Sequence, residues 1–146
     1  IGHLQSNKAK ALFDHVALWH TVDRSSIVST LARESERRGS AARILIQVNS
    51  TGEEQKSGCA PTDAASLVDQ ARATGLNVVG LMTMGPTEPD REITRRAFAE
   101  TARLARALGL STLSMGMSGD FEVAVQEGAT IVRVGTAIFG SRHVED

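Results

Sequence analysis

The sequence lacks or is poor in several residue types, and each shortage excludes a class of function. Tyrosine is absent, and only one tryptophan and one cysteine occur among the 146 residues. Aromatic residues make up 3% of the chain, so stacking platforms for single-stranded nucleic acid are not expected. The formal net charge of −1 argues against non-specific nucleic-acid binding, which depends on a strongly positive surface.

The single cysteine and the absence of long apolar runs indicate where the protein works. Cys59 has no partner for an internal disulfide, which favours a reducing compartment, and we expect a cytoplasmic protein. No apolar run reaches the ~18 residues of a membrane-spanning helix, so no membrane association is expected. The apolar fraction of 41% and the charged fraction of 23% are ordinary for a globular protein. One domain covering residues 1–146 is therefore expected.

Apolar segments of strand length alternate with segments of helical periodicity along the chain. Six strands are predicted, at residues 1–3, 16–19, 44–48, 78–82, 112–115 and 130–134. Helices are predicted at residues 5–14, from 23 or 25 to 38, at 61–73, from 90 or 92 to 108, and at 118–126. This alternation implies parallel strand pairing with right-handed crossovers.

The stretch from residue 114 to residue 140 contains a candidate anion site. Ser118 is predicted to begin a helix, where its hydroxyl and the free N–H groups of the first turn can face a phosphate. Gly135 and Thr136 follow an apolar strand and provide a second set of free N–H groups. Arg133 lies two residues before Gly135, so strand alternation places both on one face. The ordinary alternatives are a helix cap, a glycine turn and a structural ion pair.

Four blocks of the sequence resemble the pyridoxal 5′-phosphate (PLP) homeostasis proteins, which share the fold of the alanine racemase N-terminal barrel. The blocks are IGHLQSNK at residues 1–8, VNSTGEEQKSG at 48–58, GLMTMG at 80–85 and the stretch 114–140. The resemblance implies an α/β fold of the TIM type, a (β/α)8 barrel. A whole barrel needs ~200–250 residues, so about six βα units are expected here, with the first two missing.

The resemblance also implies the residues of a PLP site. The implied cofactor-binding residues are Asn7, Met115, Ser118, Arg133, Gly135 and Thr136. The serine, the glycine and Thr136 would bind the phosphate, and Arg133 would face the pyridine nitrogen. The ordinary alternative for Asn7 is an asparagine that stabilises a turn, and the ordinary alternative for Met115 is a methionine of the hydrophobic core. The matched blocks follow predicted strands, which is where sites form in parallel barrels.

The lysine that forms a Schiff base with PLP in this family, in a motif like AVSKTKP, has no counterpart in this sequence. By the resemblance it is expected upstream of residue 1, so no catalytic residue is assigned, and no metal site is expected. Lys56 is the available substitute, but it follows two glutamates in a polar loop. A reactive lysine needs burial or cationic neighbours, so Lys56 is not expected to replace it.

The resemblance predicts a non-catalytic PLP-binding protein of vitamin B6 homeostasis, with PLP-dependent enzymes as candidate recipients of the cofactor. A second hypothesis is a PLP-dependent enzyme like the amino-acid racemases, although the sequence has no tyrosine to act as the usual racemase base. A third is a phosphate-binding barrel fragment that is inert because the lysine is absent. An incomplete barrel leaves open sheet edges, so self-association is also expected.

Overall fold

Five parallel strands form a single sheet. A computed structural model describes residues 1–140, and its strands are β1 (Trp19–Val22), β2 (Arg43–Gln47), β3 (Asn77–Met82), β4 (Thr112–Met117) and β5 (Ile131–Arg133). The strands lie in the order β1-β2-β3-β4-β5, and every pairing is parallel. Strands that are consecutive in the chain are therefore neighbours in the sheet, as in an α/β barrel.

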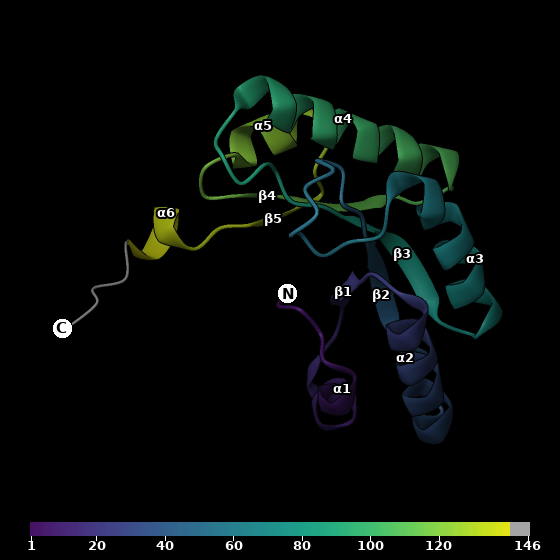
Figure 1. Cartoon of the computed structure of the whole chain (residues 1–146). Helices are drawn as coiled ribbons and strands as arrows, with labels where there is room; N and C mark the ends of the chain where they lie inside the picture. The colour runs from purple at the N-terminus through teal and green to yellow at the C-terminus, as the bar shows by residue number, and fades with distance from the viewer. Residues whose placement is uncertain (141–146) are drawn as a thin grey trace.

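Helices precede, connect and follow the strands, and they lie around the sheet (Figure 1). They are α1 (Ser6–Leu12), α2 (Ser25–Arg38), α3 (Ala64–Ala73), α4 (Arg91–Ala107), α5 (Phe121–Gln126) and α6 (Thr136–Phe139), with 3₁₀ turns at Phe13–His15 and Pro61–Asp63. The predicted start of α4 at Asp90 is confirmed, because the carboxylate of Asp90 accepts a hydrogen bond of 2.8 Å from the Ile93 N–H. Between residues 1 and 140, no helix is long and apolar enough to cross a bilayer.

The hydrophobic core lies between the sheet and the helices. Leu31 of α2 and Phe98 of α4 are fully buried in it. Three consecutive residues of β2, Ile44, Leu45 and Ile46, are each 0% exposed. Because successive side chains of a strand point to opposite faces, β2 is covered on both sides, as expected for a parallel sheet.

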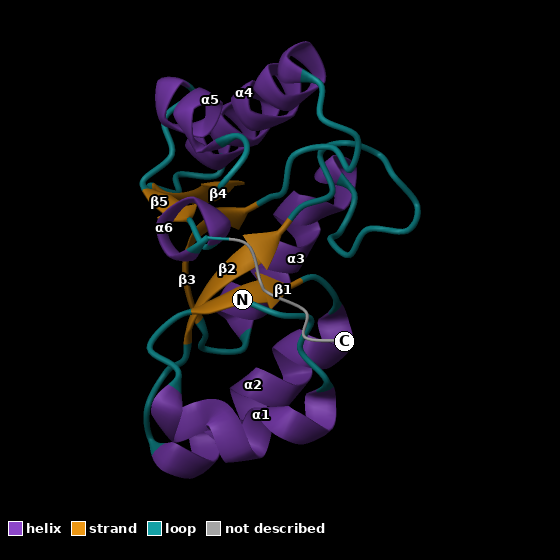
Figure 2. Cartoon of the chain, turned by 90° about the vertical axis from the view of Figure 1, so that its left-hand side faces the viewer, coloured by secondary structure: helices purple, strands orange, loops and turns teal. Residues whose placement is uncertain are grey.

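The sheet is curled, and it does not close within the described residues. His20 of β1 and Ser114 of β4 are joined by a hydrogen bond of 2.9 Å, although β2 and β3 lie between their strands. In a flat sheet, strands three places apart are separated by roughly 14 Å, so this contact requires curvature. Within residues 1–140, β1 pairs only with β2 and β5 pairs only with β4, so these two strands form the edges of the sheet. Figure 2 shows the sheet between α4 and α5 at one end and α1 and α2 at the other.

The (β/α) barrel class is confirmed, but the described residues contain five strands where six were predicted. Residues 1–3 do not form a strand. The carbonyl of Gly2 accepts a hydrogen bond from the Thr21 hydroxyl at 2.8 Å, and the carbonyl of Leu4 accepts one from Arg24 at 3.0 Å. The segment is thus held to the end of β1 by side chains instead of by a backbone ladder.

The strand predicted at residues 16–19 is displaced toward the C-terminus. The apolar run VALW suggested a strand, but the observed strand begins at Trp19 and runs to Val22. Its two middle residues, His20 and Thr21, are polar and make hydrogen bonds to Ser114 and Gly2. Polar partners in distant segments therefore decide where this strand lies, which the local apolar pattern did not indicate.

The end of β4 is shaped by Gly116. Its φ of +94° lies in the region that favours glycine, and a Cβ there would lie 2.6 Å from the Ala124 Cβ and 2.9 Å from the Phe121 Cα. Without a side chain, β4 can approach the first turn of α5 closely. This approach places the turn at residues 117–120, which contains Ser118, at the carboxyl end of the strand.

Candidate functional site

Ser118 lies in a turn and not at the start of a helix, which corrects the prediction. α5 begins at Phe121, and Asp120 occupies the position before it. The backbone N–H of Asp120 donates to the Met117 carbonyl at 3.1 Å, and its carboxylate accepts from the Met117 N–H at 2.6 Å. These two bonds close a tight turn around Ser118 and leave its hydroxyl free of the helix.

The Ser118 hydroxyl instead contacts the turn that follows β5. Its Oγ accepts hydrogen bonds from the backbone N–H groups of Gly135 and Ala137, each at 3.2 Å. Thr136 lies between these two residues and is exposed. Two turns that are 17 residues apart in the chain thus meet at the same end of the sheet, and their polar groups converge.

A cavity of about 590 Å³ opens beside this meeting point. It lies between the loop that precedes α4 and the turn that precedes α5, and Arg91, Met117, Ser118 and Phe121 are among its lining residues. The cavity makes the turn that contains Ser118 accessible from outside.

Arg133 points away from the helices and into the curled side of the sheet. Its Nη1 donates to the Ser114 hydroxyl at 2.8 Å, and its Nη2 donates to the Thr83 carbonyl at 3.0 Å. Burial lowers the pKa of the guanidinium, and the charge of Asp120 acts in the opposite direction. Among residues 1–140 no carboxylate forms an ion pair with Arg133, so the structural ion pair considered as an alternative is not what holds it.

Asn7 and Met115 lie apart from this group. Asn7 is the second residue of α1, and it is exposed. Met115 is fully buried in the hydrophobic core. It follows Ser114 in β4, whose hydroxyl faces Arg133, so alternation directs the Met115 side chain to the opposite face, toward the helices.

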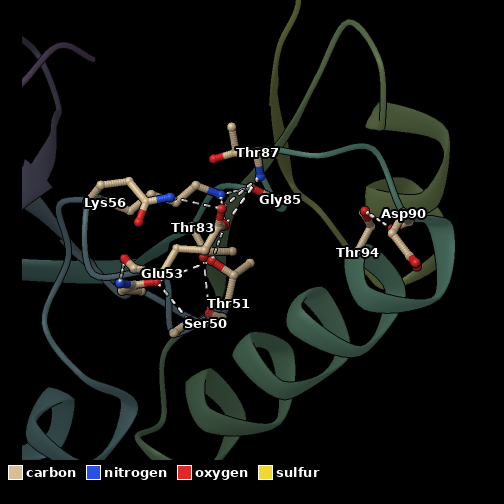
Figure 3. A network of polar contacts seen from close by, with 12 residues as sticks. Ser50, Thr51, Glu53, Lys56, Thr83, Gly85, Thr87, Asp90 and Thr94 are labelled. Carbon is tan, nitrogen blue, oxygen red and sulfur yellow. Dashed lines mark hydrogen bonds and ion pairs between the residues drawn. The ribbon is translucent and has the colours of Figure 1, made fainter.

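A second polar cluster, which we call the rim network, joins the loop after β2 to the loop after β3 (Figure 3). The Glu53 carboxylate accepts from the Thr51 hydroxyl at 2.8 Å and from the Thr87 N–H at 3.2 and 3.3 Å, and it forms an ion pair with Lys56. Lys56 also donates to the Gly85 carbonyl at 2.5 Å. Hydrogen bonds from Lys56 and then Thr87 lower the pKa of Glu53 to about 2.

The two candidate nucleophiles of this part of the chain are Lys56 and Cys59. The Lys56 ammonium is engaged by the Glu53 carboxylate and the Gly85 carbonyl. Burial raises the pKa of the Cys59 thiol to about 11, so the thiolate needed for nucleophilic attack is scarce at neutral pH.

The sequence analysis missed the residues that hold Arg133 in place. We call the set formed by His20, Ser114 and Arg133 the interior network, since its hydrogen bonds cross the curled face from β1 to β5. The signal was present, because His20 and Ser114 are polar residues inside strands that also contain apolar residues. Without the strand order, however, the sequence gives no indication that they meet.

Comparisons with known proteins agree with this architecture. The model of the family described as alanine racemase, N-terminal domain, matches residues 1–143. A pyridoxal phosphate homeostasis protein of Deinococcus radiodurans is 45% identical over 139 residues, which are 95% of this chain and 65% of that protein. A protein of the same name from Vibrio cholerae is 40% identical over 148 residues, covering 97% of this chain and 63% of the relative. The chain thus spans less than two thirds of the length of these relatives.

Solved structures give the same result. PipY of Synechococcus elongatus, solved without PLP, is 34% identical with a TM-score of 0.89, covering 96% of this chain and 69% of that chain. The same protein with PLP bound has a TM-score of 0.82 at 32% identity, with coverage of 96% and 68%. Because the family model matches nearly the whole sequence and these relatives share more than 30% identity with it, the chain belongs to the alanine racemase N-terminal domain family, in its group of pyridoxal phosphate homeostasis proteins.

Proposed function

We propose that this chain binds pyridoxal 5′-phosphate and serves PLP homeostasis without catalysing a reaction of its own. The observation that carries the proposal is the convergence of the Ser118 hydroxyl with the N–H groups of Gly135 and Ala137. The relatives are named for this role, and PipY has been solved with PLP bound.

Ser118, Gly135 and Thr136 would hold the phosphate. The backbone N–H groups of Gly135 and Ala137 both donate to the Ser118 Oγ, at 3.2 Å each, so a bound phosphate would replace this oxygen as their acceptor. Space is open at Gly135, where an added Cβ would meet nothing within 4 Å. A phosphate dianion accepts several short hydrogen bonds at once, and this donor set fits it.

Arg133 would face the pyridine ring. A guanidinium stays protonated and can only donate, so it would leave the ring nitrogen unprotonated. Bound PLP supplies an aldehyde and an electron-withdrawing ring, and that ring is a weaker electron sink when its nitrogen is neutral. This expectation disfavours transamination. The roles of Asn7 and Met115 stay predictions.

The wider role is part of the same proposal. We infer that PLP-dependent enzymes receive the cofactor and that the protein works in the cytoplasm. The sequence contains a single cysteine, the partly buried Cys59, so it forms no internal disulfide, which suits a reducing compartment.

Binding of pyridoxine 5′-phosphate tests the proposal, because this compound has no aldehyde and its affinity does not depend on a lysine. In calorimetric titrations we expect Ser118→Ala and Arg133→Met each to weaken binding about 10- to 150-fold, since a hydrogen bond to a charged group contributes about 1.5–3 kcal/mol. Ser111→Ala, at an exposed position just before β4, is the matched control and should bind like the wild type.

Two outcomes would contradict the proposal. One is a wild-type protein that does not bind pyridoxine 5′-phosphate at millimolar concentration. The other is binding no tighter than that of inorganic phosphate, which would favour an inert phosphate-binding barrel.

We further propose that the open sheet edge at β5 pairs with a second copy. Val132 of β5 is 38% exposed, and Ile138 and Phe139 of α6 are 68% and 84% exposed, so within residues 1–140 apolar side chains flank the edge of β5 that does not pair with β4. Light scattering should detect a dimer that Phe139→Ser weakens. Val125→Ser on α5, where the side chain is 58% exposed, is the control. A monodisperse monomer would contradict this proposal.

A further inference from the structure

The interior network runs through a single hydroxyl group. Ser114 is 0% exposed, and its Oγ lies 2.8 Å from the Arg133 Nη1 and 2.9 Å from the His20 Nδ1. His20 comes from β1 and Arg133 from β5, which are the two edges of the sheet. The hydroxyl therefore links the two edges across the curled face.

The chemistry of these groups determines the direction of the hydrogen bonds. A guanidinium has donors and no acceptor, so Ser114 must accept from Arg133. The hydroxyl proton of Ser114 is then available for donation, and the unprotonated Nδ1 of His20 is placed to accept it. This arrangement requires a neutral imidazole that carries its proton on Nε2.

A protonated imidazole does not fit the same place. Its Nδ1–H would donate to the Ser114 oxygen, which can accept from two donors, but the buried hydroxyl proton would then lose its acceptor. The other groups around His20 also oppose protonation. Burial lowers the pKa of His20 most, and the positive charge of Arg133 also lowers it.

We infer that His20 is a positioning residue that, by accepting the Ser114 hydroxyl proton in its neutral form, fixes the guanidinium of Arg133 toward the ring of a bound pyridine phosphate. The part that concerns the ligand rests on the proposed function. The relay from Arg133 through Ser114 to His20 is a property of the free protein and can be tested without ligand.

The first experiment uses the free protein. Long-range ¹H–¹⁵N NMR spectra report the tautomer of each histidine, and we expect the Nε2–H form at His20. In Arg133→Gln the pKa of His20 should rise, because a nearby cation is removed, whereas exposed His15 serves as an internal reference that does not change. The Nδ1–H tautomer at His20, or a His20 pKa unaffected by Arg133→Gln, would overturn the inference.

A pair of substitutions at residue 20 separates positioning from a merely structural role. The amide oxygen of His20→Gln can accept the Ser114 proton, whereas His20→Leu cannot. The NMR signal of the Arg133 side chain should keep its chemical shift in His20→Gln and move in His20→Leu. If both variants fold like the wild type and the NMR signal of the Arg133 side chain has the same chemical shift in both, the inference is overturned.

The second experiment measures binding of pyridoxine 5′-phosphate between pH 8 and pH 5. The phosphate titrates in this range in every variant, so the informative quantity is the ratio of wild-type to His20→Gln affinity. We expect this ratio to fall about tenfold as His20 becomes protonated, since one pKa unit of coupling corresponds to a tenfold change. A constant ratio would overturn the positioning role. Failure of both proteins to bind at any pH would instead overturn the proposed function, while the NMR experiments still decide on the relay.

Discussion

The rim network and the interior network are both polar, but they are built in different ways. Glu53 and Lys56 of the rim network are three residues apart in one loop, and they hold the next loop through Thr87 and Gly85. In the interior network, residues of three strands meet at Ser114, and its bond to His20 spans 94 residues of sequence. The rim network is local and partly exposed, whereas the interior network depends on the curvature of the whole sheet.

This difference determines how each network should respond to a mutation. A partly exposed ion pair keeps contact with water, so its loss costs less than the loss of a buried partner. A buried donor or acceptor that loses its partner keeps the full cost of its desolvation. The two networks should therefore differ in the size of the effect and in its dependence on pH and salt.

The largest effect is expected from Ser114→Ala. The substitution leaves the Arg133 Nη1 and the His20 Nδ1 without their shared partner, and we expect the free energy of unfolding to fall by about 2–4 kcal/mol. Urea denaturation measures this loss. Ser111→Ala, in an exposed position of the same segment, is the control, and equal losses for both variants would show that the interior network does not stabilise the fold.

A smaller effect is expected from Glu53→Gln, which removes the ion pair with Lys56. The pKa of Glu53 is lowered from 4.5 to about 2 in the folded protein. The Glu53 carboxylate therefore binds a proton less readily in the folded state than in the unfolded state. The stabilisation is therefore fully present above pH 4.5 and is lost as the pH falls toward 2. The difference between the urea midpoints of wild type and Glu53→Gln should shrink over that range. Exposed Glu54→Gln is the matched control, and the same change with pH in both variants would contradict the prediction.

The smallest expected effect is that of salt on the destabilisation caused by each substitution, and it allows the two networks to be compared directly. The side chains of Lys56 and Glu53 are 13% and 24% exposed, so molar salt should reduce the destabilisation caused by Glu53→Gln. The destabilisation caused by Ser114→Ala should stay the same, because Ser114 is buried. If salt reduced both to the same extent, the distinction between the networks would be wrong.

The candidate site was predicted in part, and its errors have physical reasons. Ser118 and Gly135 were chosen because each follows a predicted strand, and the structure brings them within hydrogen-bond distance at 3.2 Å. The predicted helix cap at Ser118 was wrong, because Gly116 and Asp120 form a turn before α5 starts. His20 was missed because a polar residue in a strand indicates an interior partner only when the strand opposite is known.

The sequence alone determined the alternation of strands and helices, the parallel sheet and the end of the strands at which polar groups gather, because these follow from local periodicity and from glycine positions. Only the tertiary structure decided which polar groups meet. The curl of the sheet places His20 beside Ser114 across two intervening strands, and the hydrogen bonds of Arg133 then turn its guanidinium inward. Contacts of this kind join residues far apart in the chain, so no local pattern contains them.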